Sequence, residues 1–206
     1  MARGFKSSIS LPVAMLVFAM LAACADEPGD NAAGAAAGAA QTAVLFPDDF
    51  KGVCSGAGVA RATAFDAAAT AHKALYFRTY EDDFTDQSSA LPGDWTVAWS
   101  PDGDTLTAID MVVCARRTAA QQVKVCDGYE DDGKATDNQV RWHTATYDLS
   151  ARDARTGAVL GRTTVEATST DCPMLQMFDD DSEVVDGYAS LSDTVVTDFV
   201  RQHMGK

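Results

Sequence analysis

The sequence predicts an α+β domain, in which an antiparallel β-meander of about five or six strands is covered by a C-terminal amphipathic helix. Strand-like segments separated by turn residues fill the middle of the chain, and apolar residues recur at helical spacing near its end. An even number of cysteines within the domain adds the expectation of two disulfides.

The N-terminus has the pattern of a signal peptide. Arg3 and Lys6 precede an apolar stretch of roughly ten residues, which is too short to span a membrane as a helix. The stretch ends in Leu21-Ala22-Ala23-Cys24, which resembles the lipobox of bacterial lipoproteins.

That resemblance implies that residues 1–23 are removed and that Cys24 receives a lipid. The protein would then be held at the extracytoplasmic side of the cell membrane by its acyl chains, which bind the bilayer through the hydrophobic effect. An ordinary secretory peptide, in which Cys24 plays no part, is the alternative.

Residues 24–45 are rich in alanine and glycine and have nothing large to bury. As a flexible coil this segment would span about 25 Å, so we expect a tether, and a short alanine-rich helix is the alternative. Residues 46–206 remain as a single domain, because about 160 residues is the usual size for one hydrophobic core.

Six segments are enriched in the β-branched and aromatic residues that favour strands. They are residues 74–78, 94–99, 106–114, 121–126, 140–149 and 158–167. Turn residues at 100–104 and 153–157 separate neighbouring segments. Trp95, Val97 and Trp99 alternate, so we expect them to share one face of a sheet.

The C-terminal helix is predicted from Ser192-Asp193 onward. Its apolar residues recur at spacings of three and four, which places them on one face of a helix. They are Val195, Val196, Phe199, Val200 and Met204. An acidic start and a basic end also favour a helix here.

With Cys24 assigned to lipid, Cys54, Cys114, Cys126 and Cys172 remain for two disulfides in an exported chain. If residues 106–115 and 121–126 form a hairpin, Cys114 lies opposite Cys126, which leaves Cys54 to pair with Cys172. A metal site is the alternative, but the chain has no CxxC pair and no histidine at ligand spacing from the cysteines.

Three pieces of the domain are similar to small exported proteins of high-GC actinobacteria. These pieces are residues 51–58, residues 147–149 together with 153–160, and residues 171–173. The resemblance covers about half of the domain, and it implies no activity.

The formal charge of −14 disfavours nucleic acid as a partner, because an acidic surface repels phosphate backbones. Two acidic clusters are weak candidates for calcium binding, since calcium prefers carboxylate oxygens. Their candidate ligands are Asp127, Asp131, Asp132, Asp179 and Asp181. Solvated surface loops are the alternative interpretation, because neither cluster follows the EF-hand pattern.

No serine of the chain has the surroundings of a nucleophile elbow, and nothing in the sequence pairs His72 or His143 with a nucleophile. We expect no cofactor. The hypothesis is therefore a non-catalytic envelope lipoprotein that binds a protein or a small molecule. An exported hydrolase with an unrecognised site and a calcium-stabilised surface domain are the alternatives. An exposed apolar patch would favour binding, and a deep pocket with shifted titratable groups would favour catalysis.

Overall fold

The computed structural model describes residues 44–80, 83–101, 103–178 and 183–204. Cys24 and the calcium candidates Asp179 and Asp181 lie outside the described residues, as do the expected signal peptide and nearly all of the expected tether. Within the described ranges, no helix combines the length and the apolar character needed to cross a membrane.

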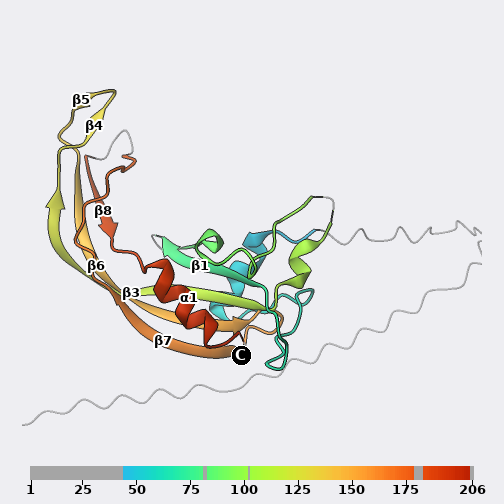
Figure 1. The fold of residues 1–206 in the computed structure, drawn as a ribbon. Coiled ribbons are helices and arrows are strands. Elements are labelled where there is room, and N and C mark those ends of the chain that lie inside the picture. Colours follow the sequence, from blue (N-terminus) through green and yellow to red (C-terminus); the bar gives the residue numbers. More distant parts are fainter. Residues whose placement is uncertain (1–43, 81–82, 102, 179–182, 205–206) are drawn as a thin grey trace, which may run out of the picture. The chain divides into compact units, whose positions relative to one another are not determined.

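The described residues form one sheet of six strands, one two-stranded hairpin and several short helices (Figure 1). In chain order the elements are the 3-10 helix η1 (Pro47–Ser55), β1 (Ala74–Tyr80), β2 (Asp83–Asp86), the 3-10 helices η2 (Ser88–Ala90) and η3 (Thr105–Ala108), β3 (Met111–Cys126), β4 (Glu130–Asp131), β5 (Lys134–Ala135), β6 (Gln139–Asp153), β7 (Val159–Ala167), β8 (Val184–Tyr188) and the α-helix α1 (Asp193–Arg201). This arrangement confirms the α+β class and a sheet of about six strands.

The long strands β3 and β6 form the centre of the sheet. They pair antiparallel from Met111 opposite Asp153 to Cys126 opposite Val140, with two register shifts on the way. Along its other edge β6 pairs first with β8 and then with β7. Figure 1 shows β8 and the β4–β5 hairpin at the same end of the long strands.

The expectation of a purely antiparallel meander is only partly met. Strands β3, β6 and β7 pair antiparallel, but β1 runs parallel to β3 and β8 runs parallel to β6. Strand β8 packs closely against β6 at Gly187, where there is no room for a side chain. A Cβ atom added to Gly187 would lie 2.6 Å from the Trp142 ring. Such long-range parallel pairings leave no local turn signal in the sequence.

Both faces of the sheet are buried around the first residues of β3. On one face, α1 contributes Val196, Phe199 and Val200, which belong to the same core cluster as Met111 and Val113. On the opposite face, the core includes three residues of η1 and alternate residues of β3. These are Phe50, Val53 and Cys54 from η1, and Val112 and Cys114 from β3. Residues 111–115 therefore form a continuous buried run, as in a strand covered on both sides.

Two expected strands differ in the structure. Residues 94–99 form turns and extended coil, in which Trp95 packs with the α1 core and Val97 with the η1 core, so the three alternating residues do not share one face. Alternation alone cannot make a strand where no partner strand pairs with the segment. The segment predicted at 106–114 begins as η3 and becomes a strand only at Met111.

All four domain cysteines are in disulfides, as expected, but the predicted pairing is wrong. Cys54 pairs with Cys114, and Cys126 pairs with Cys172. Cys114 and Cys126 lie in the same strand, and twelve residues of extended chain separate their backbones by about 40 Å. Residues 116–120 looked like a turn, yet they contain no glycine, proline, asparagine or aspartate that would reverse the chain.

The C-terminal helix and the second predicted turn are present. Ser192 caps α1 by accepting a hydrogen bond from the Val195 amide at 3.4 Å. In the turn between β6 and β7, the Asp153 carboxylate accepts hydrogen bonds from the amides of Arg155 and Thr156, and Gly157 adopts a φ of 75°.

Candidate functional site

A loop after β7 exposes a group of large apolar side chains. We call residues Cys172 to Phe178 the methionine loop. Met174 is 95% exposed, and Leu175 and Met177 are each 91% exposed. Single exposed apolar residues are ordinary on protein surfaces, but three within four positions form a patch, which makes this loop the candidate site.

The base of this loop is fixed to the rest of the sheet. Cys172 is joined by its disulfide to Cys126, the last residue of β3. The Tyr129 hydroxyl donates a hydrogen bond to the Pro173 carbonyl at 3.1 Å, and the Tyr129 and Phe178 rings meet edge to face at 5.3 Å. Burial in this contact raises the pKa of Tyr129. The apolar side chains therefore extend from an anchored base.

Acidic residues surround the loop. The loop and the β4–β5 region border an open hollow with a volume of about 980 Å³. Among the described residues, its charged lining is wholly acidic and comprises Asp127, Glu130, Asp131 and Glu183. A cavity lined by carboxylates attracts cationic groups, and its apolar wall offers them a hydrophobic contact as well. The arrangement suits a ligand that is both basic and apolar.

The described calcium candidates do not converge on one point. Asp127 and Asp131 both line the hollow, whereas Asp132 lies in the β4–β5 turn with a φ of 49°. Within the described part of the chain, no group of three or more histidine, cysteine, aspartate or glutamate side chains could hold a metal ion. Calcium binding that involves Asp179 and Asp181 remains a prediction.

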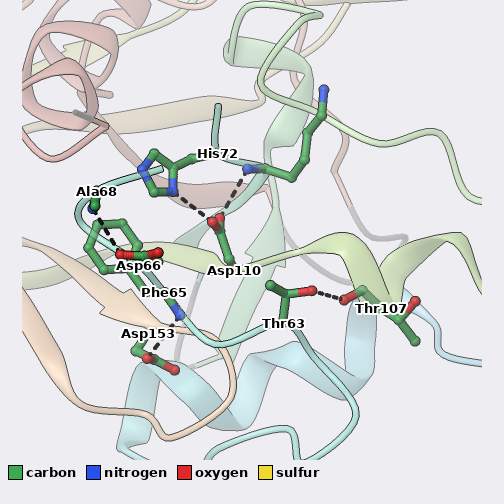
Figure 2. A network of polar contacts seen from close by, with 9 residues as sticks. Thr63, Phe65, Asp66, Ala68, His72, Thr107, Asp110 and Asp153 are labelled. Carbon is green, nitrogen blue, oxygen red and sulfur yellow. Dashed lines mark hydrogen bonds and ion pairs between the residues drawn. The ribbon is translucent and has the colours of Figure 1, made fainter. Parts of the chain in front are cut away.

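His72 forms the kind of histidine–aspartate pair found in catalytic sites, but it lies inside the protein (Figure 2). Its Nδ1 lies 2.6 Å from the Asp110 carboxylate, and its ring stacks on Phe65 at 4.6 Å. The side chain has no exposed surface, and its Nε2 makes no hydrogen bond to any described residue. A substrate cannot reach that nitrogen in this conformation.

Instead, the pair helps to fasten the long segment before β1 to the sheet. Asp110 also accepts a hydrogen bond from the Lys73 amide at 3.0 Å. Earlier in the segment, the Thr63 hydroxyl donates to the Thr107 carbonyl, and the Phe65 amide donates to the Asp153 carboxylate (Figure 2). The network holds irregular backbone in place with polar contacts.

His143 likewise has a packing role. It is half-buried in β6, where its ring stacks on Tyr188 of β8 at 5.0 Å. The tyrosines Tyr76 and Tyr147 belong to the α1 core, and burial raises the pKa of both, to about 12 for Tyr76. These shifts have a structural cause and do not identify an active site.

None of the sites predicted from the sequence includes Met174, Leu175 or Met177 of the methionine loop. The run Met174-Leu175-Gln176-Met177-Phe178 follows neither the two-residue period of a strand nor the period of a helix. The sequence does contain one signal for an exposed apolar loop. It is an apolar run with neither period, which lies between a cysteine–proline pair and an acidic cluster. The sequence does not show that these side chains have no core to enter.

Comparison of the chain with protein-family models, with curated proteins and with solved structures finds no match.

Proposed function

We propose that this protein is an envelope lipoprotein, anchored through Cys24, whose domain binds a protein partner by its methionine loop. The observation that carries the binding part is the exposure of Met174, Leu175 and Met177, each above nine-tenths, on a loop with an anchored base. Burying one such side chain against a partner is worth about 1.5–3 kcal/mol.

Methionine suits a recognition surface, because its unbranched and polarisable side chain adapts to partners of different shape. The disulfide to Cys126 and the hydrogen bond from Tyr129 reduce the freedom that the loop loses on binding. A loop whose base is already ordered binds at a smaller entropic cost than a free one.

The acidic rim favours a basic partner. Asp127, Glu130, Asp131 and Glu183 line the hollow, and the whole chain has a charge of −14. Complementary charge speeds association and excludes acidic competitors. We therefore expect a partner segment in which lysine or arginine accompanies large apolar residues, as in a basic amphipathic helix.

The proposed location rests on the N-terminal sequence, namely the lipobox resemblance of residues 21–24 and the alanine- and glycine-rich segment that follows. Two disulfides in the domain agree with export to an oxidising compartment. Mass spectrometry of the mature protein tests the anchor directly. An N-terminal Cys24 carrying acyl chains is expected, and an unmodified cysteine would contradict it.

Affinity capture from solubilised envelopes tests the binding site. The chain with Met174, Leu175 and Met177 all changed to Ser should lose the captured partner, because its apolar contact is gone. Val159→Ser is the matched control, since Val159 is a 40%-exposed apolar residue in β7, outside the loop. Capture should also weaken as ionic strength rises. Equal capture by the triple variant and the wild type would overturn the proposal.

A further inference from the structure

A second pocket, separate from the methionine loop, gathers positive charge in this acidic protein. It lies on the η1 face of the sheet beside the Cys54–Cys114 disulfide and has a volume of about 110 Å³. Three arginines line it, namely Arg116 of β3, Arg152 of β6 and Arg162 of β7. We call it the arginine pocket. The cluster is notable because the whole chain has only 16 lysines and arginines against 30 acids.

Strand register explains why the three side chains converge. Cys114, Ser150 and Arg162 lie directly opposite one another on three adjacent strands, so they share one face. Arg116 follows Cys114 by two positions and Arg152 follows Ser150 by two positions, and side chains two apart on a strand point the same way. Three sequence-distant guanidinium groups thus lie beside one disulfide.

These charges are not neutralised by the protein. Among the described residues, no carboxylate lies within 4.0 Å of a guanidinium nitrogen of any of the three, in contrast to Arg61, Arg141 and Arg201, which form ion pairs. Asp148 also lines the pocket, but its Oδ1 accepts a hydrogen bond from the Thr164 hydroxyl at 3.0 Å. Three cations therefore face one carboxylate.

Donor groups remain unused as well. The Arg152 Nη1 donates to the Gly157 carbonyl at 2.9 Å, whereas the Arg152 Nε is buried without a hydrogen-bond partner among the described residues. The Arg116 guanidinium lies over the Phe84 ring, 4.8 Å from its centre. Burial, and then repulsion by Arg162 and Arg116, lower the pKa of Arg152. A bound anion would relieve this repulsion and could accept hydrogen bonds from the guanidinium groups of Arg116 and Arg162, which are exposed.

We propose that the arginine pocket binds the phosphate group of a small ligand, either inorganic phosphate or a phosphomonoester. Guanidinium groups are planar forks of N–H donors that match the oxygens of phosphate. The volume of about 110 Å³ admits a group of this size, and is well below the roughly 300 Å³ at which pockets for drug-sized ligands begin. The Ser150 hydroxyl at the pocket can add a neutral donor.

Titration of inorganic phosphate into the purified mature chain, followed by calorimetry at low ionic strength, tests this inference. Wild type should show one saturable site. Arg162→Gln should weaken binding by about tenfold or more, because it removes a charge-assisted donor pair. Asp148→Asn should tighten binding, because it removes the one opposing charge. Arg201→Gln is the matched control, since Arg201 is an exposed arginine of α1 paired with Asp198.

Near-ultraviolet circular dichroism confirms that each variant is folded. The proposal is overturned if wild type shows no saturable binding, if Asp148→Asn weakens binding, or if Arg201→Gln loses as much affinity as Arg162→Gln. A parallel titration with phosphoserine separates the two sources of phosphate. Tighter binding than that of inorganic phosphate supports a phosphate borne on a larger molecule, and weaker binding supports free phosphate as the ligand.

Discussion

The two halves of the long strands β3 and β6 are built differently. In the inner half, residues 111–115 of β3 are buried on both faces, paired with β1 and β6 and covered by α1 and η1. In the outer half, residues 116–125 are mostly exposed, and the strand ends at the disulfide to the methionine loop. The same pair of strands thus provides a core at one end and a support for the methionine loop at the other.

Because of this difference, we expect the inner half to determine stability, and the binding that we propose would use the outer half. Buried side chains on two faces supply most of the free energy of folding that the hydrophobic effect provides. The outer half of β3 buries less and leaves most of its side chains exposed to solvent. Variants matched across the two halves can therefore separate folding from binding.

The largest effect is expected from the disulfides. The two bridges join cysteines that are 60 and 46 positions apart in sequence. Each should contribute about 4 kcal/mol to the free energy of unfolding by constraining the unfolded chain. Removing the inner bridge, as Cys54→Ala with Cys114→Ala, should cost more, because both residues are buried in the η1 core. Removing the outer bridge, Cys126–Cys172, should lower the free energy of unfolding by less, and it should also weaken capture of the partner. Urea unfolding measures the loss of stability in each variant. Equal losses would contradict the expectation that the inner half of the strands contributes more to stability.

A second pair of variants compares single apolar residues. Phe50→Ala should lower the free energy of unfolding by about 3–5 kcal/mol, because Phe50 is fully buried in η1 and a cavity would remain. Leu175→Ala should change it by less than about 0.5 kcal/mol, because Leu175 is exposed on the methionine loop. Chemical denaturation of the two variants checks the contrast. A large loss from Leu175→Ala would show that the loop packs in solution.

The pH dependence of stability gives a smaller effect. Burial raises the pKa of Tyr76 from 10.0 to about 12, so the unfolded chain loses this proton at lower pH than the folded chain. Its contribution is fully present below pH 10 and is lost as the pH rises through 12, by about 3 kcal/mol in total. Tyr76→Phe should reduce the fall in stability between pH 10 and pH 12. An unchanged slope in alkaline urea titrations would contradict this origin.

Elements with a local signal were predictable from sequence. The capped α1 and the turn built on Asp153 and Gly157 each depend on residues close together in the chain. The prediction split β3 into two strands, at residues 106–114 and 121–126, and this was wrong. The outer half of β3 is exposed and polar, and the sequence pattern of a polar strand is similar to that of a loop. That division also produced the wrong disulfide pairing.

The two candidate sites depend on long-range register, which no local pattern encodes. Arg116, Arg152 and Arg162 meet only because β3, β6 and β7 pair in one particular alignment. The methionine loop is set in place by a bridge to Cys126, 46 residues earlier in the chain. By contrast, the resemblance of residues 21–24 to a lipobox depends on four adjacent residues, so the role proposed for Cys24 comes from the sequence alone.

Site-specific cross-linking in intact cells tests whether the methionine loop contacts a partner in the envelope, as we propose. A photo-reactive residue replaces Leu175 in one strain and Thr163, an exposed residue of β7, in another. We expect a discrete adduct with a basic protein from position 175 and none from position 163. No adduct from position 175, or the same adducts from both positions, would contradict the assignment of binding to this loop.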